Sequence, residues 1–167
     1  ARACSGDIPA GEAFLAAIRP FVWRKSLDFG AIREIGRLTA QIRANTRGAA
    51  TAGPGFNVKK GRGGIREVEF YAQTHQLIHG GRNPSLRVRG TRAALDALAV
   101  AGIIAEDDAR LLGESYDRLR VIEHRLQMVA DQQTHSLPDS ADALDGVARL
   151  DGLACGADLI AEVAGIT

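Results

Sequence analysis

The sequence is poor in the residues that mark several classes of protein. Cys4 and Cys155 are the only cysteines among 167 residues, so neither a disulfide framework nor a cysteine metal site is indicated. No apolar run approaches the length of a membrane span. The formal net charge is only +1, which argues against a nucleic-acid binder with a basic surface. We therefore expect no membrane and no nucleic acid as partner, and a cytoplasmic, reducing setting.

Strand-like alternation of apolar and polar residues is also missing, whereas helical periodicity is present. The first clear stripe recurs every three or four residues from Phe29 to Ile42, and the longest runs from Leu112 to Val129. Further helices are predicted before and between these two, and a shorter one follows Pro138 at 141–150. The pattern predicts an all-α bundle of about five to seven helices with one Gly-rich loop.

Several helix boundaries are also predicted. Pro20 should begin a new helical turn after a break at Arg19, because proline lacks a backbone donor. Asp28 and Thr91 are predicted N-caps. The Gly-rich loop covers residues 48–63, GAATAGPGFNVKKGRG, and one extended pair is expected in it at Phe56 and Val58.

The stretch KKGRGGIREVEF, residues 59–70, combines cations, glycines and a helix start. Glycines let backbone amides approach a ligand, and a helix N-terminus carries unpaired N–H groups and a partial positive charge. Together these are the parts of a phosphate site. The alternative is a purely structural turn. The residues of the phosphate hypothesis are Lys59, Lys60, Gly61, Arg62, Gly63 and Gly64.

The helix after Gly64 is expected to be apolar on two sides, with a polar stripe between them. A helix of that kind is buried on both sides, so its polar stripe should face a cleft, a water channel or itself. The stripe consists of Arg66, Glu69, Gln73 and Gln76, of which the first three are assigned to the phosphate-facing set. An ordinary i,i+3 ion pair between Arg66 and Glu69 is the alternative. Glu69→Ala should disturb the fold or the activity more than Glu106→Ala.

Other candidates for chemistry are weaker. His75 and His79 have the i,i+4 spacing of a metal pair, yet no third ligand has suitable spacing, so they are interpreted as core or cleft-edge histidines. Asp131 and His135 can form a proton-transfer pair, but a structural helix end is favoured. The triplet Glu123-His124-Arg125 indicates a solvated or inter-helix charge cluster.

Three segments in this order resemble a known family: GRGGIREVEFYAQTHQLIHGG, then RNPSLRVRGT, then DQQTHSLP at the end of the longest helix. They look like the helical domain of the bacterial glutamine-synthetase adenylyltransferase/adenylyl-removing enzyme. FVWRKSLDFGAIREI resembles the stretch before these motifs in that family. The resemblance covers nearly the whole chain, and the GGIREVEF form is similar to the first, adenylyl-removing half.

The resemblance implies a role in the control of nitrogen assimilation. In that multifunctional enzyme one half removes AMP from glutamine synthetase by phosphorolysis and the other attaches AMP from ATP. Implied cofactors of the full enzyme are Mg²⁺ and ATP, ADP or phosphate, and implied partners are glutamine synthetase and PII signal proteins. The segment Lys59 to Gly64, with Arg66, Glu69 and Gln73, would line the open side of the catalytic cleft.

The family's metal-binding carboxylates lie in an upstream nucleotidyltransferase domain, which is not found here. We therefore expect a fragment of a longer polypeptide that is inactive alone, with no catalytic residue and no metal ligand of its own. The expected boundaries are 1–8 as the tail of that upstream domain, 9–151 as the bundle, and 152–167 as the start of a further, truncated helix. The alternatives are a non-catalytic helical interaction module and the related domain of a PII uridylyltransferase.

Overall fold

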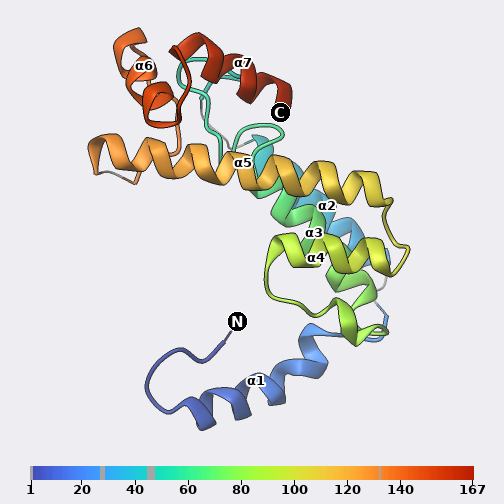
Figure 1. Cartoon of the computed structure of the whole chain (residues 1–167). Helices are drawn as coiled ribbons and strands as arrows, with labels where there is room; N and C mark the ends of the chain where they lie inside the picture. The colour runs from blue at the N-terminus through green and yellow to red at the C-terminus, as the bar shows by residue number, and fades with distance from the viewer. Residues whose placement is uncertain (1, 27–28, 45–47, 132) are drawn as a thin grey trace.

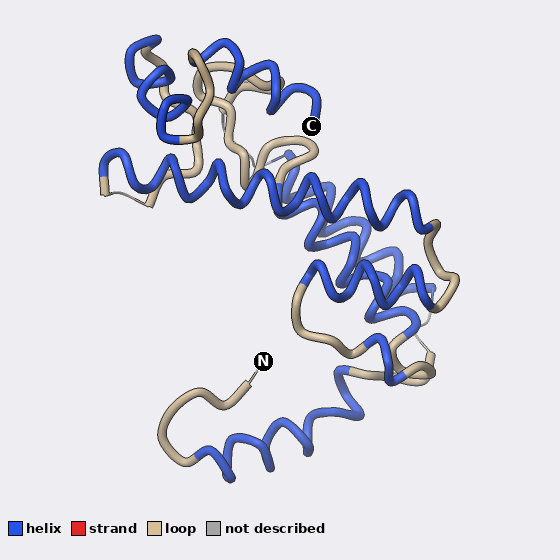
Figure 2. Tube along the Cα trace, in the orientation of Figure 1, coloured by secondary structure: helices blue, strands red, loops and turns tan. Residues whose placement is uncertain are grey.

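The computed structural model describes residues 2–26, 29–44, 48–131 and 133–167. Within these ranges the chain is helical, with no strand, as Figure 2 shows. The predicted all-α bundle is therefore confirmed. The helices in chain order are α1 Ile8–Val22, α2 Phe29–Ala44, α3 Ile65–His79, the 3₁₀ turn η1 Pro84–Leu86, α4 Thr91–Val100, α5 Glu106–Ala130, α6 Ala141–Leu150 and α7 Gly156–Ile166.

Helix α5 is the longest element, and α3, α4, α6 and α7 are arranged along it, whereas α1 lies away from it (Figure 1). The first turn of α5 carries Glu106, Asp107 and Asp108. Their negative charges interact favourably with the positive, N-terminal end of the helix dipole. Helices α3 and α4 pack near its first half, whereas α6 packs on its second half and α7 packs mainly on α6. Arg118 of α5 also forms ion pairs with Asp151 and Glu162, and so joins the α6–α7 pair to the long helix.

Two apolar cores result from this arrangement. The first core joins residues 56–58 of the Gly-rich loop and the start of α3 to the middle of α5 and to α6 and α7. The second core joins the middle of α3 to η1, α4 and the start of α5. Leu159 and Val163 of α7 are fully buried in the first core, so residues 152–167 pack with the bundle.

The first two helices stand apart from these cores. No residue of α1 is buried, and Phe14 and Phe21 are 64% and 72% exposed. Among the described side chains of α2 none is buried either. Figure 1 shows α1 at the far end of the molecule from α6 and α7. The chain after α1 is held to the bundle at Gly80 and Gly81, where Trp23 and Arg24 lie against the glycine backbone.

Two of the predicted helix boundaries are wrong. Helix α1 continues through Pro20 to Val22, because Pro20 lies in the last turn and the carbonyl of Arg19 still accepts a hydrogen bond from Trp23 N–H at 2.8 Å. Thr91 is the first helical residue of α4, and Gly90 takes the N-cap position without a side-chain bond. The expected N-cap Asp28 lies outside the described residues.

Candidate functional site

The Gly-rich loop is held in place by a segment almost eighty residues further along the chain. Gly55 N–H donates to Leu137 O at 3.0 Å, Leu137 N–H to Phe56 O at 2.8 Å, and Val58 N–H to His135 O at 2.9 Å. Asn57 and Ser136 form an isolated antiparallel bridge. Extended pairing at Phe56 and Val58 was expected from the sequence, but the sequence did not indicate its partner. The residues just before the motif 59–70 therefore lie against residues 135–137 in the fold.

The backbone amides at the start of α3 are not available to a ligand. Ile65 N–H donates to Val58 O at 3.0 Å, Arg66 N–H to Lys59 O at 2.9 Å, and Glu67 N–H to Gly64 O at 2.9 Å. In front of them, Gly63 N–H donates to the side chain of Glu67. These N–H groups are satisfied within the loop, so an anion at this place would be bound mainly by side chains.

The lysine amides that precede them are likewise engaged. Asn57 Oδ1 accepts from Lys59 N–H at 3.1 Å and from Lys60 N–H at 2.8 Å. This side chain therefore closes the turn that carries both lysines. An Asx-type turn of this kind fixes the loop through residues that are neighbours in the sequence.

The glycines serve the close packing of the loop itself. A Cβ on Gly61 would lie 2.7 Å from the ring of Phe56, and one on Gly64 would lie 2.6 Å from Val58 O. Gly63 has φ +71°, which favours glycine, and its missing Cβ leaves room for Thr167. These glycines therefore let the chain's own backbone and side chains approach the loop closely.

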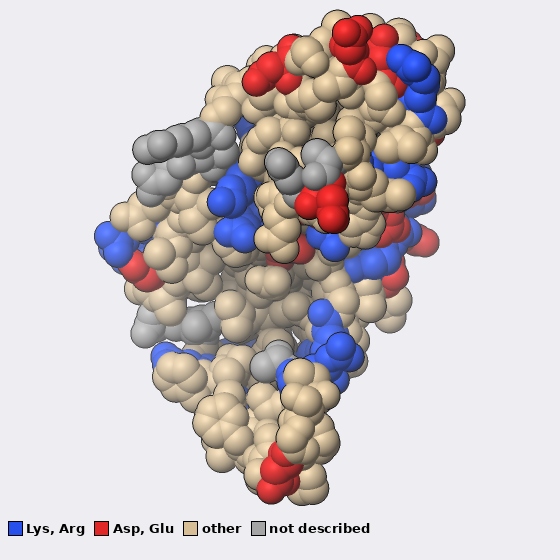
Figure 3. Space-filling view, turned by 90° about the vertical axis from the view of Figure 1, so that its left-hand side faces the viewer, with Lys and Arg blue, Asp and Glu red and all other residues tan. Residues whose placement is uncertain are grey.

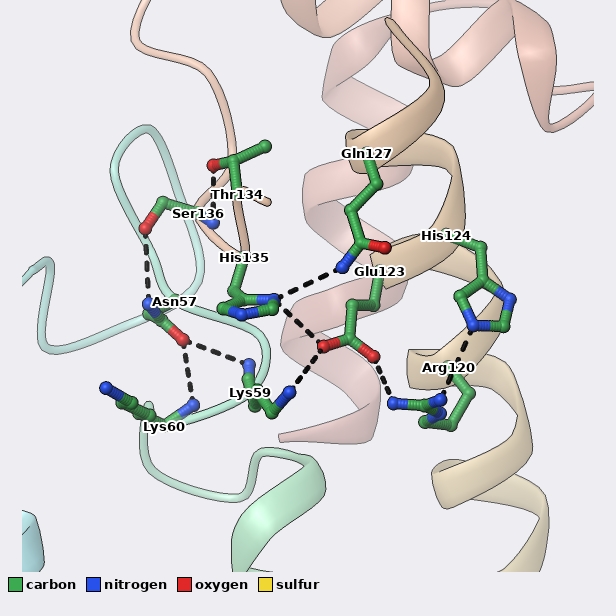
Figure 4. A network of polar contacts seen from close by, with 10 residues as sticks. All are labelled: Asn57, Lys59, Lys60, Arg120, Glu123, His124, Gln127, Thr134, His135 and Ser136. Atoms are coloured by element: carbon green, nitrogen blue, oxygen red, sulfur yellow. Dashed lines mark hydrogen bonds and ion pairs between the residues drawn. The ribbon is translucent and has the colours of Figure 1, made fainter. Parts of the chain in front are cut away.

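The centre of the site is a buried carboxylate that the sequence did not single out. Glu123 on α5 is 1% exposed. Figure 4 shows its carboxylate between the side chains of Lys59, His135 and Arg120. Its Oε1 lies 3.2 Å from Nζ of Lys59 and 2.9 Å from Nδ1 of His135, without a well-aligned hydrogen bond from either. Its Oε2 accepts from the guanidinium of Arg120. A single buried charge therefore connects the Gly-rich loop, segment 134–137 and α5.

The charges around Glu123 also act on His135. Burial lowers the pKa of His135 below its usual value, and the positive charge of Lys59 lowers it further, while Glu123 acts in the opposite sense. The neutral imidazole is thereby favoured, and Gln127 Nε2 lies 3.5 Å from its Nδ1. His135 thus pairs with Glu123 and not with Asp131, which ends α5 in the left-handed conformation at φ 47°. The proposed proton-transfer pair of Asp131 and His135 is wrong, and the structural helix end is confirmed.

A signal for Glu123 was present in the sequence. It follows Leu119 by four residues and precedes Leu126 by three, so it lies on the buried face of the longest helix. A carboxylate on that face requires cationic partners. Its partners come from three separate stretches of sequence, and for that reason residues 123–125 were interpreted only as a charge cluster.

The polar stripe of α3 does not line one cleft. Gln76 is buried and donates to the carbonyls of Leu86 at 2.6 Å and Val88 at 2.9 Å, whereas Gln73 is exposed. Arg66 and Glu69 are half-buried, and among the described residues they form no ion pair with each other. The stripe is therefore divided between core, intermediate and solvent positions.

The cationic side chains at the loop differ in how accessible they are to an anion. Lys59 is engaged with Glu123, while the side chains of Lys60 and Arg62 are exposed. Neither Arg62 nor Arg66 forms an ion pair among the residues that the structure describes. Two guanidinium groups thus remain able to bind an anion beside a loop whose backbone is already fixed.

A hollow of about 590 Å³ lies beside the start of α3. Of the predicted site residues only Gly63 borders it, together with Glu67, Tyr71 and His75 of α3 and Leu111 of α5. Burial lowers the pKa of His75, with a smaller contribution from His79, whose ring stacks at 6.0 Å. No group of three or more His, Cys, Asp or Glu residues that can hold a metal is found among the described residues.

Fold and site together define a class of protein. It is an all-α domain in which a glycine-rich, cationic loop is fixed in front of a helix by a buried glutamate. Two arginines beside the loop form no ion pair within the described ranges. The described part of the chain contains no helix with the length and apolarity needed to cross a membrane.

The chain belongs to the family described as GlnD PII-uridylyltransferase, whose sequence profile matches residues 34–161. Several curated relatives are named bifunctional glutamine synthetase adenylyltransferase/adenylyl-removing enzyme. That of Bradyrhizobium diazoefficiens is 55% identical over 91% of this chain and 15% of its own length. That of Rhodopseudomonas palustris strain HaA2 is 53% identical over 92% and 16%, and that of Xanthobacter autotrophicus is 51% identical over 91% and 15%. The family expected from the sequence is therefore confirmed, and the chain spans less than a fifth of these relatives.

Proposed function

We propose that the chain is a helical accessory domain of an enzyme that reversibly adenylylates glutamine synthetase, and that it faces the nucleotide or phosphate cleft of that enzyme. The names of relatives at 50–55% identity over about nine-tenths of the chain support this proposal. Under it, residues 1–8 end an upstream nucleotidyltransferase domain and residues 9–151 form the accessory bundle, and the helix within residues 152–167 packs against that bundle. The adenylyl-removing half remains our assignment, and the chain alone is expected to be inactive.

The observation that carries the proposal is a pair of arginines, one on the fixed loop and one in the first turn of α3, that form no ion pair among the described residues. Arg62 and Arg66 are the side chains that we assign to phosphate contact, with Lys60 beside them. Glu123 holds Lys59 and thereby the loop, so these cations are positioned before a ligand arrives. Glu69 and Gln73 remain in the proposed set as polar neighbours, and Gly61, Gly63 and Gly64 shape the turn.

Magnesium is assigned to another part of the whole enzyme. The described residues offer no cluster of carboxylates that suits the ion. When bound elsewhere, Mg²⁺ would neutralise phosphate charge, and ATP, ADP or phosphate would be the reactants. The chain's own contribution would be to bind and orient phosphate oxygens through side chains. Glutamine synthetase is the proposed protein substrate, PII signal proteins are the proposed regulators, and the cytoplasm is the proposed location.

The test uses variants of the whole enzyme and of this chain. In the whole enzyme, Arg62→Ala with Arg66→Ala should lower the rate of AMP removal from glutamine synthetase by at least about tenfold, as expected for lost charged hydrogen bonds. Arg149→Ala on α6, also exposed, is the matched control. In the isolated chain, phosphate or ADP should shift the arginine side-chain Nε–H resonances of residues 62 and 66 more than the loop amides, which are already hydrogen-bonded. Unchanged activity together with unchanged resonances would refute the phosphate role.

A second candidate function is protein interaction. The exposed phenylalanines of α1 favour it, because an apolar helix with no buried side chain is suited to contact another protein surface. If the arginine variants leave activity intact while Phe14→Ser with Phe21→Ser weakens the association with glutamine synthetase or PII in a pull-down of the whole enzyme, the interaction-module alternative gains support.

A further inference from the structure

A second hollow lies away from the glycine-rich loop. It measures about 780 Å³ and lies between α1 and the connector that follows α3. The backbone bends into an open C at this point, with α1 as its lower arm (Figures 1 and 2). Figure 3 shows the same side of the molecule as a depression with Lys and Arg side chains on either side of it.

Arginines dominate the polar lining of this hollow. Arg2 and Arg19 come from the N-terminal arm, Arg87 and Arg89 come from the connector, and Glu12 is the only acidic residue among the lining residues. The lining therefore contains four guanidinium groups and one carboxylate, and its charge is positive. Within the described ranges, Arg2, Arg19 and Arg89 form no ion pair or hydrogen bond through their side chains. Their charges are available to an anion.

One of the four arginines is fixed in position. Arg87 Nε donates to Gly80 O at 2.7 Å and Nη2 to Gly81 O at 3.3 Å. Its guanidinium also lies over the ring of Trp23, 5.6 Å from the centroid. The carbonyls and the ring orient this cation but do not neutralise it. An arginine held in this way loses little conformational entropy when an anion binds.

The rest of the lining is apolar. Leu15 and Ile18 of α1 and Trp23 at its C-cap provide one wall, and Pro84 and Val88 lie on the connector side. The volume falls in the range of about 300–1,000 Å³ that is usual for small-molecule sites. The hollow can therefore hold an organic group as well as a charged one.

We propose that this hollow is a second anion site, which binds a small molecule carrying several phosphate charges. Arginine forks match phosphate oxygens in pairs, and several unneutralised forks favour a polyanion over a singly charged carboxylate. The site shares no residue with the loop 59–64, so it goes beyond the proposed function and does not depend on it. The ligand class is a di- or triphosphate, which can be inorganic or attached to an organic group.

Trp23 supplies a built-in reporter, because it is the chain's only tryptophan and lies in the wall of the hollow. We would titrate the chain with tripolyphosphate and follow Trp23 fluorescence. Calorimetry would then measure the binding of tripolyphosphate, ADP, inorganic diphosphate and acetate. Tripolyphosphate should bind and change the fluorescence, and acetate should not bind. Tighter binding of ADP than of inorganic diphosphate would identify the organic group as part of the ligand, and equal binding would identify an inorganic polyanion.

Variants at exposed positions separate this site from non-specific attraction. Arg19→Glu and Arg89→Glu should each weaken tripolyphosphate binding by at least about tenfold, and Arg89→Lys by less, because lysine keeps the charge without the fork. Arg149→Glu makes the same charge change on α6 and should leave binding within about twofold. Thermal unfolding of each variant shows whether it is folded. No fluorescence change and no heat with the unaltered chain, or an equal loss in Arg149→Glu, would overturn the proposal.

Discussion

The two helices at the start of the chain and the five that follow differ in how their apolar faces are used. Helices α1 and α2 carry clear apolar positions, yet none of their described side chains is buried. In α3 to α7 the apolar positions are distributed between two cores, and Leu95, Leu98, Leu119 and Ile122 are completely buried. This difference shows that an amphipathic pattern indicates a helix but does not identify which element packs against its apolar face.

The largest expected effect separates the two regions directly. Ile122→Ala removes a side chain with no exposed surface from the first core, and we expect a loss of about 2–4 kcal/mol in the free energy of unfolding. Leu38→Ala in α2, where the leucine is 48% exposed, should change it by less than about 1 kcal/mol. Urea unfolding followed by circular dichroism measures both. Similar losses in the two variants would mean that α2 is covered in solution.

The buried carboxylate gives the next effect. Glu123→Ala leaves Lys59 without its anionic partner, and we expect a loss of roughly 2–3 kcal/mol, below the usual range for a buried pair because Lys59 is partly exposed. Glu106→Ala at the exposed start of α5 should cost less than about 0.5 kcal/mol. Half-buried Glu69 is expected between them in the same urea assay. A Glu69 variant as damaging as Glu123→Ala would show that the polar stripe of α3 is more enclosed than the fold indicates.

Alanine substitution at two glycines should change the stability of the chain in opposite directions. Gly61→Ala places a Cβ 2.6 Å from Asn57 O and should destabilise the chain by about 1–3 kcal/mol. Gly36→Ala meets no atom within 4 Å in the middle of α2 and should increase helical stability by about 0.5–1 kcal/mol. Thermal melts of the two variants test the difference. A neutral Gly61 variant would argue against the tight packing of the loop.

A smaller effect is expected from pH. The pKa values of His135 and His75 are both lowered in the folded chain, mainly by burial. The unfolded chain therefore binds protons more readily, so stability is complete above about pH 6.5 and falls as the pH drops below that value. His135→Gln should make stability less sensitive to pH between about 6.5 and 5, whereas His124→Gln on the exposed side of α5 should not. Identical pH profiles for the two variants would exclude His135 as a source of the effect.

The smallest effect belongs to the first helix. Phe14→Ser replaces a 64% exposed side chain, and we expect the melting temperature of the chain to stay within about 1–2 °C. Its exposed apolar area should fall, which binding of a hydrophobic dye can measure. A large loss of stability would show that α1 packs against the chain in solution.

Much of the fold could be predicted from the sequence because it depends on neighbouring residues. The stripe from Leu112 to Val129 predicts α5, Pro138 precedes α6, and Gly80 ends α3. Pro20 was misjudged, since a proline in the last turn forfeits one hydrogen bond without ending the helix at once. The candidate site was predicted less well: its cations were found, but the ion pair that fixes Lys59 was not.

The sequence by itself determined the helical class, most helix ends, the family and the cationic loop, because these depend on periodicity, on capping and turn residues, and on motifs contiguous in the chain. Only the tertiary structure decided that the loop amides are internally bonded, that Glu123 meets Lys59 and His135, and that arginines from two distant segments surround one hollow. The physical reason is that burial and charge pairing depend on distances in space, and side chains from residues 59, 123 and 135 approach one another only after the helices have packed.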